Sequence, residues 1–345
     1  MSFIDFCVIT RGIDPSLGRL DYESLSQQAL MEMVISQMST ENQDLFKDTN
    51  GHYLDINEWD GVEMSDNTNS VRFIAWDNEA DGAASVKYQG QGTIHFRWLP
   101  DTVIKFFMND RGFEGTLDCH ALPRKMEEFE ASNNNLDGEL NLTALPSCVI
   151  QFDISENFFS GTLDLQHLPK TLSVLGVIVN KFEGGVNTSN LLQIMKHLGL
   201  SENTLSGNVD LTRLPSKMND AHFDVNGFSG TLDLTQLPQT LKQLSLQINK
   251  FAGTLDLLHL PQGMVNLGLH SNRLCGDVHP EQLPKILRLL MLQDNAFDGT
   301  NFVGKIPRSL VAFNLEKNRF KGHTLVGVSN SDEKAKAVIN QISYW

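Results

Sequence analysis

The sequence lacks any apolar run of about 18 residues, the length from which a membrane-spanning helix is read. Its first twenty residues do not resemble a signal or transit peptide, because Asp5, Arg11 and Asp14 interrupt their apolar stretch. Basic residues are also scarce, with 27 Lys and Arg against 42 Asp and Glu and a formal net charge of -15. An acidic chain repels phosphate backbones, so nucleic acid is excluded as an expected partner.

Cysteine is rare as well. The four cysteines, Cys7, Cys119, Cys148 and Cys275, lie far apart and show no metal-ligand spacing. We therefore expect free thiols in a reducing compartment rather than a disulfide framework.

Catalytic patterns are missing too. Gly90-Gln91-Gly92 lacks the third glycine and the following helix of a dinucleotide-binding loop, and there is no P-loop or nucleophile elbow. The ten histidines scatter without metal-ligand spacing. We expect no enzyme activity, no cofactor and no catalytic or metal site.

What the sequence does contain is a repeat of about 23 residues, clearest in its glycines. A Leu-Pro pair follows the same period from Leu99-Pro100 to Leu283-Pro284, with imperfect steps at Leu191-Leu192 and Ile306-Pro307. Such a repeat predicts a solenoid, in which each unit buries its apolar face only against its neighbours. The glycines at this spacing are Gly92, Gly115, Gly138, Gly161, Gly184, Gly207, Gly230, Gly253, Gly276, Gly299 and Gly322.

Aligned on its Leu-Pro pair, the unit reads L-P-x-x-L-x-x-L-x-L-x-x-N-x-F-x-G-T-L-D-L-x-x. In the copy at 237–259, Leu244 and Leu246 alternate with period two and predict a short strand with one buried face. Leu255 and Leu257 predict a second short strand on another side of the coil. The segment 249–253 between them is expected to turn.

Stacking would align equivalent residues of successive coils in columns. Phenylalanine or leucine recurs from Phe113 to Phe320 and predicts a buried column. Asparagine recurs from Asn134 to Asn318, and these inward amides are expected to bond backbone groups at the turn. A ladder of Asp and Asn is expected to accept turn N–H groups, with calcium binding as the alternative. The ladder comprises Asp118, Asn141, Asp164, Asn187, Asp210, Asp233 and Asp256.

These motifs carry a resemblance to a known family. L-x-x-L-x-L-x-x-N resembles the core signature of leucine-rich repeat proteins, and N-x-F-x-G-x-L is similar to their plant-type subclass. The resemblance implies an α/β repeat solenoid that is mostly β. It further implies an arc with a parallel concave sheet, a short second sheet on the flank, and helical caps at both ends.

Three segments follow along the chain. Residues 1–98 are expected to form an N-terminal helical cap and a degenerate first coil, and residues 99–328 to form ten repeats of the length given above. Residues 329–345 are expected to form a C-terminal capping helix, because Ser331 is a suitable N-cap. Trp59-Asp60-Gly61-Val62 resembles the N-terminal cap of plant-type members, although the cysteine pair of their secreted representatives is missing.

The positions beside the strand leucines are expected to line the concave face and to set specificity. Val174, Ile178 and Val179 are unusually apolar for this face, which often indicates a docking site. We expect a protein partner with a basic, partly apolar surface; the alternative is packing of Val174 and Ile178 against the irregular stretch 187–192. The candidate partner-binding residues are Glu128, Glu130, Asp153, Glu156, Val174, Ile178, Val179, His197, His222, Asp224, Gln247, Ile248 and His270.

The sequence thus predicts a non-catalytic protein-interaction scaffold or structural subunit. It would bind through the concave face, belong to a hetero-complex, and lie in the cytoplasm or another reducing compartment. The alternative is an extracellular or cell-surface recognition module whose leader and anchor are missing from this chain. Asn141-Leu142-Thr143 and Asn187-Thr188-Ser189 are glycosylation sequons, and a glycan on either asparagine would favour that alternative.

Overall fold

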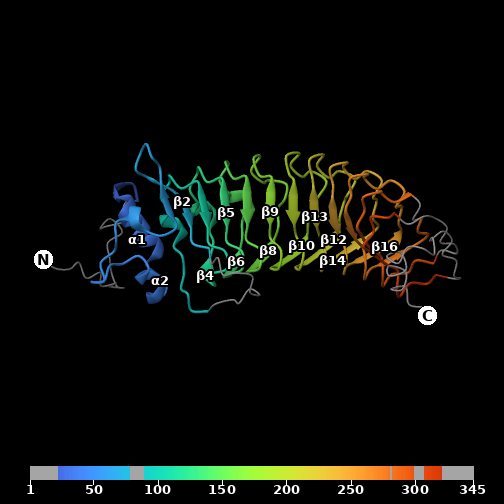
Figure 1. Cartoon of the computed structure of the whole chain (residues 1–345), viewed down its shortest axis with the longest axis horizontal. Helices are drawn as coiled ribbons and strands as arrows, with labels where there is room; N and C mark the ends of the chain where they lie inside the picture. Colours follow the sequence, from blue (N-terminus) through green and yellow to red (C-terminus); the bar gives the residue numbers. More distant parts are fainter. Residues whose placement is uncertain (1–21, 78–88, 280–281, 299–306, 321–345) are drawn as a thin grey trace.

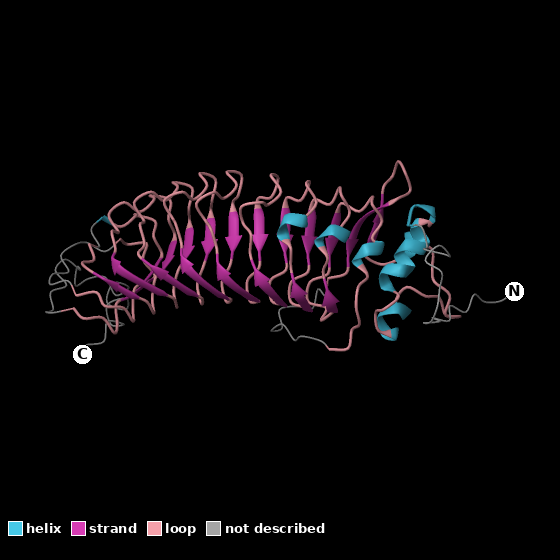
Figure 2. Ribbon diagram, turned by 180° about the vertical axis from the view of Figure 1, so that it is seen from behind, coloured by secondary structure: helices cyan, strands magenta, loops and turns pink. Residues whose placement is uncertain are grey.

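The computed structural model describes residues 22–77, 89–279, 282–298 and 307–320, which form an elongated stack of coils (Figure 1). Helical elements gather at the N-terminal end of the stack, and strands form the remainder (Figure 2). None of the helices in these ranges is long and apolar enough to cross a membrane. The helical elements are η1 (Tyr22–Ser24), α1 (Gln27–Ile35), α2 (Thr40–Asp44), η2 (Ile56–Glu58), η3 (Phe96–Trp98), η4 (Cys119–Ala121) and η5 (Leu142–Ala144).

In the described residues, twelve strands form the longer of two sheets: the antiparallel pair β1 and β2, followed by one strand from each successive coil. The first pair is antiparallel, and every later pair is parallel and in register, so that Leu198 lies between Leu175 and Ala221. The strands are β1 (Val62–Met64), β2 (Val71–Ala75), β3 (Lys105–Phe107), β5 (Glu128–Glu130), β7 (Gln151–Asp153), β9 (Val174–Gly176), β11 (His197–Gly199), β13 (Asp220–His222), β15 (Gln243–Ser245), β17 (Asn266–Gly268), β19 (Leu289–Met291) and β20 (Ala312–Asn314).

Eight strands form the second sheet, also with parallel neighbours. They are β4 (Glu114–Thr116), β6 (Asn135–Glu139), β8 (Phe158–Thr162), β10 (Lys181–Gly185), β12 (Thr204–Asn208), β14 (Gly227–Gly230), β16 (Lys250–Thr254) and β18 (Arg273–Cys275). The predicted two-sheet solenoid is therefore confirmed.

The position predicted for the second strand was wrong. The strand is Lys250–Thr254, the segment expected to turn, and Leu255 and Leu257 follow it as buried residues. Phe251 is the inward residue of the strand, and Gly253 continues it with φ of 93°. The chain turns only afterwards, where the Asp256 carboxylate accepts the N–H of Leu258 at 2.7 Å. Leu255 and Leu257 alternate because both are buried, one before and one after Asp256, and not because they form a strand.

The predicted columns form the core. Phe113, Phe159, Phe182, Phe228 and Phe251 are completely buried. Buried aliphatic side chains from each coil surround them and make one continuous core along the stack. Each unit thus buries its apolar face against the next one, as expected for a solenoid.

The asparagine column has the predicted backbone partners. The Asn157 side-chain nitrogen donates to the carbonyls of Ala131, Ile154 and Ser155 at 2.8, 3.0 and 3.1 Å. Its side-chain oxygen accepts the N–H of Leu136 at 3.0 Å. One amide therefore ties two successive coils together and satisfies backbone groups that the turn leaves unpaired.

The Asp and Asn ladder also behaves as predicted. The Asp233 carboxylate accepts both the N–H and the hydroxyl of Thr235, at 2.9 and 2.6 Å. The same N–H bond, two residues on, recurs at Asp118, Asn141, Asp164, Asn187, Asp210 and Asp256.

The N-terminal region contains α1 and α2 where a helical cap was expected, whereas the C-terminal capping helix expected at 329–345 lies outside the described residues. Buried Leu30, Met31, Val34 and Ile35 hold α1 against the first coil. Ser26 caps this helix by accepting the N–H of Ala29 at 3.2 Å.

Candidate binding surface on the long sheet

The exposed side of the long sheet, called here the long-sheet face, brings together only part of the predicted set. Six of the predicted residues are on its strands: Glu128, Glu130, Asp153, Val174, His197 and His222. Four lie two residues beyond a strand: Ile178, Asp224, Gln247 and His270. The other three, Glu156, Val179 and Ile248, lie in the turn that joins the two sheets.

The acidic beginning of this face is partly neutralised. The Lys105 ammonium group lies 2.8 Å from a Glu128 carboxylate oxygen. Glu130 accepts hydrogen bonds from the side-chain amides of Asn109, at 3.1 Å, and Gln151, at 2.6 Å. Burial raises the pKa of Glu130 above its usual range. Sequence reasoning missed Lys105, although it occupies the same strand position as Glu128 one coil earlier.

The middle of the face contains strand glycines that neighbouring side chains cover. A β-carbon on Gly199 would stand 2.8 Å from the Ile178 side chain, and one on Gly176 would stand 2.5 Å from the Asp153 carboxyl carbon. Ile178 therefore lies across the strand of the next coil. The absence of a side chain at Gly199 is what makes room for it.

Three histidines are spread along the later coils. His197 Nδ1 lies 2.7 Å from a carboxylate oxygen of Asp220 in the neighbouring strand. His222 Nδ1 lies 3.1 Å from the hydroxyl of Ser245. Burial lowers the pKa of His270, and the Asp224 and Asp294 carboxylates oppose that effect.

The turn after each long-sheet strand from β3 to β20 has one residue with positive φ, immediately before the asparagine of the column or, after Asp110, before Arg111 at the same position. We call these residues the left-handed row: Asp110, Asn133, Glu156, Val179, Glu202, Val225, Ile248, Ser271, Asp294 and Lys317. Stacking fixes this conformation, because the Val179 N–H donates to the Ser201 carbonyl at 3.0 Å and the Ile248 N–H to the His270 carbonyl at 2.9 Å.

Three members of the left-handed row are β-branched. Val179, Val225 and Ile248 have φ of 53°, 52° and 54°, a region that β-branched residues strongly avoid. None is buried, and Ile248 is 45% exposed. Val225 was not among the predicted site residues. Its position just before an asparagine of the asparagine column is the signal that would have found it.

The described part of the chain contains no metal centre, and its two sequons have the same local geometry as other members of the Asp and Asn ladder. There, no group of three His, Cys, Asp or Glu side chains is placed to hold a metal ion. Asn141 and Asn187 are exposed, and their side-chain oxygens accept the hydroxyls of Thr143 and Ser189 at 2.7 and 2.6 Å. Asp233 and Thr235 make the same contact, so the ladder itself accounts for both sequons.

No protein-family model matches this chain, and no curated protein sequence does. Solved structures share its fold. A plant ice-binding protein matches with a TM-score of 0.67 and 18% identity, over 89% of this chain and 98% of that one.

Two further structures match over less of their own length. The PEPR1-AtPEP1 structure has a TM-score of 0.56 and 20% identity, over 64% of this chain and 32% of that one. A TDR receptor has a TM-score of 0.50 and 20% identity, over 66% and 45%. This chain therefore spans less than half of either of those two chains. At these identities, the likenesses establish the fold alone.

Proposed function

We propose that this chain, which has the leucine-rich repeat fold, is a non-catalytic recognition module that binds another protein. The binding surface consists of the long-sheet face between β7 and β17 and the left-handed row beside it. This surface is continuous from coil to coil because the strands are in register.

The observation that carries the proposal is the placement of Val179, Val225 and Ile248. A left-handed conformation costs an L-residue about 1–2 kcal/mol, and asparagine or glycine adopts it more readily. These side chains offset little of that cost by burial, since Val179 and Val225 are half-buried and Ile248 is exposed. Exposed apolar groups held in a strained conformation favour a binding role over a structural one.

The charge of the surroundings supports a partner with basic groups. Glu156 and Glu202 alternate with the apolar members of the left-handed row, and Asp220 and Asp224 lie in the adjacent coil. Complementary charge would steer association and fix the register of the partner, while the apolar groups would contribute most of the affinity.

For the compartment, we favour the cell-surface or extracellular alternative over the intracellular scaffold. It is supported by the coil architecture that this chain shares with the PEPR1-AtPEP1 structure and a TDR receptor, and the exposure of Asn141 and Asn187 would allow glycosylation at either. Expression in a eukaryotic secretory system, followed by glycosidase treatment and intact mass measurement, tests it. Loss of glycan mass from Asn141 or Asn187 supports this proposal. Unmodified protein that accumulates in the cytosol of the native cell favours the scaffold.

Affinity purification with mass spectrometry tests the binding role. Val174→Asp combined with Ile178→Asp places two charges in the middle of the surface and should abolish recovery of the main partner. Thermal stability should change little, because both side chains are only half-buried. Unchanged recovery of the partner would rule this surface out.

A second candidate, ice binding, is favoured by one observation. Thr116, Thr162, Thr231 and Thr254 are exposed at equivalent positions along the second sheet, with Glu139, Gly185 and Asn208 at that position in the coils between Thr116 and Thr231. Only Thr231 and Thr254 belong to neighbouring coils; their hydroxyl and methyl groups would suit a repetitive ligand, and the plant ice-binding protein shares the coil stack. Recrystallisation of ice in the presence of wild type and Thr231→Lys tests this candidate. Equal crystal growth with both proteins and with buffer would dismiss it.

A further inference from the structure

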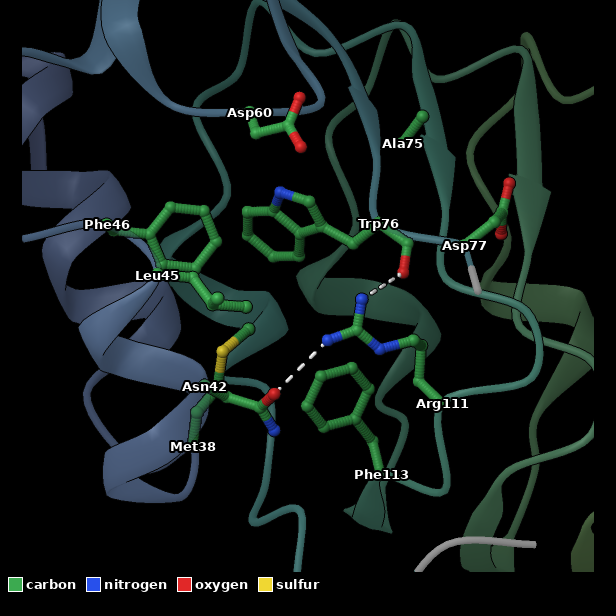
Figure 3. A pocket seen from close by; sticks show the side chains of 10 residues that line it. All are labelled: Met38, Asn42, Leu45, Phe46, Asp60, Ala75, Trp76, Asp77, Arg111 and Phe113. Carbon is green, nitrogen blue, oxygen red and sulfur yellow. Dashed lines mark hydrogen bonds between the residues drawn. The ribbon is translucent and has the colours of Figure 1, made fainter. Parts of the chain in front are cut away.

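A cavity lies where the N-terminal helices meet the first coil (Figure 3). Its volume is about 180 Å³, and it opens to solvent. A cavity of about 150 Å³ in another protein holds benzene, so this one has room for a single six-membered ring with a small substituent. The lining residues are Met38, Asn42, Leu45, Phe46, Asp60, Ala75, Trp76, Asp77, Arg111 and Phe113.

The rim of the cavity is rigid because Arg111 ties the cap to the coil. Arg111 occupies the position that asparagine holds in later coils. Its guanidinium donates to the Trp76 carbonyl at 2.9 Å and to the Asn42 side-chain oxygen at 3.1 Å. Asn42 in turn donates to the side chain of Gln91 at 3.0 Å. The cavity is therefore preformed, which lowers the cost of binding.

One buried polar group on its wall lacks a partner among the residues that the structure describes. Trp76 is only 5% exposed, and its indole nitrogen has no hydrogen-bond partner within those ranges. Figure 3 shows this nitrogen directed toward the Asp60 side of the cavity. A buried N–H without an acceptor costs about 1–3 kcal/mol. A ligand atom that accepts this hydrogen bond would remove that cost.

The charges select among possible ligands. Asp60 and Asp77 contribute two carboxylates against one guanidinium, which disfavours an anion. A ligand hydroxyl group suits both the Trp76 indole and the Asp60 carboxylate, because it can accept a hydrogen bond from the indole N–H and donate one to the carboxylate. The remaining wall is mainly apolar, and Leu45 is 63% exposed at its edge.

We infer that this cavity binds a neutral ring alcohol of the size of phenol. The inference is independent of protein binding on the long-sheet face, because none of the residues proposed for that surface lines the cavity. The same ring could belong to a free small molecule or to a tyrosine side chain of a partner. We assign the ring to a free molecule, and insertion of a partner's tyrosine side chain through the opening is the other outcome of the test.

Titration of the full chain with phenol and with toluene, followed by NMR of the tryptophan indole N–H signals, tests the inference. In wild type, phenol should bind at least as tightly as toluene and shift the Trp76 signal. Trp76→Phe should weaken the binding of phenol about tenfold, the effect of one hydrogen bond, and the binding of toluene less than about twofold. N-acetyltyrosinamide should bind more weakly than phenol.

Trp98→Phe is the matched control. Trp98 is also buried with an unpartnered indole nitrogen but does not line this cavity, so its replacement should leave phenol binding unchanged. Leu45→Asn, at an exposed position that tolerates substitution, should weaken both ligands equally. Toluene binding more tightly than phenol in wild type, or equal phenol affinity in wild type and Trp76→Phe, would overturn the inference. Tighter binding of N-acetyltyrosinamide would overturn the assignment to a free molecule.

Discussion

The Thr231 side-chain methyl covers Gly253 of the next coil, 3.0 Å from where a β-carbon on that glycine would stand. Gly253 also has φ of 93°, a conformation that other residues rarely adopt. Thr116 covers Gly138 and Thr162 covers Gly184 in the same way, each at 3.1 Å. The positive φ, common to the described glycines at this position of the repeat, explains why glycine recurs there, and a covering methyl adds a second constraint where the preceding coil has threonine.

Gly253→Ala and Gly207→Ala separate these two causes. Both glycines have positive φ, but a β-carbon on Gly207 would meet only the Gly185 α-carbon, at 3.9 Å. Gly207→Ala should cost about 1–2 kcal/mol of unfolding free energy from strain. Gly253→Ala should cost about 1–3 kcal/mol more from overpacking. Denaturant unfolding measures both.

Thr231→Ser provides the control for this pair, because serine lacks the covering methyl. When Thr231→Ser is combined with Gly253→Ala, the loss of unfolding free energy should fall to nearly that of Gly207→Ala. Equal losses for the two alanine variants would contradict the role given to the methyl.

Asn249→Leu tests the asparagine column. The Asn249 side chain donates to three carbonyls, those of Phe223, Leu246 and Gln247, and accepts the N–H of Phe228. Leucine would leave these backbone groups unpaired, at a cost of about 3 kcal/mol or more. Thermal and denaturant unfolding measure the loss. Exposed Asn190 is outside the asparagine column, and Asn190→Leu should change the free energy of unfolding by less than about 0.5 kcal/mol. Equal losses of stability in the two variants would contradict the structural role of the asparagine column.

Ile248→Asn should make the protein more stable, by about 1 kcal/mol, because asparagine tolerates the left-handed conformation. The same change should weaken partner binding. Val311→Asn is the matched control, since Val311 is 62% exposed but is not in the left-handed row. It should not raise the unfolding midpoint. A loss of stability in Ile248→Asn would show that the isoleucine serves the fold.

His270 should make the chain sensitive to acid. Because burial lowers its pKa, the unfolded chain takes up the proton at a higher pH than the folded chain. Its contribution to stability is therefore present above the usual histidine pKa and is lost as pH falls through the lowered value. His270→Gln should reduce the drop in unfolding midpoint between pH 7 and pH 5. His120→Gln, at an exposed position, should leave that drop unchanged. An unaltered drop in His270→Gln would refute this origin.

The sequence predicted the coil stack because its period is visible without structure. Phe251 and Asn249 belong to columns that follow the period of the repeat, and each needs a buried partner in the neighbouring coil. The second strand was misplaced because the alternation of Leu255 and Leu257 has the same period in a buried turn as in a strand. Periodicity records burial, whereas the strand depends on backbone pairing.

The candidate site was predictable only in outline. Strand positions such as Val174 and His197 follow from the leucine spacing, so their exposure on one face could be inferred. The left-handed conformation of Val179 is set by the bond of its N–H to the Ser201 carbonyl in the next coil, so its place before a repeat asparagine marks it, whereas its residue type does not. The cavity beside Trp76 joins segments that lie far apart along the chain, and no sequence motif marks it.

The most direct test of the account is the Kd of the purified partner for three forms of the chain. Val174→Asp with Ile178→Asp should bind at least tenfold more weakly than wild type. Thr162→Asp, a charge on the exposed second sheet, should bind like wild type. Wild-type affinity in the double variant, or an equal loss in Thr162→Asp, would contradict recognition through the long-sheet face.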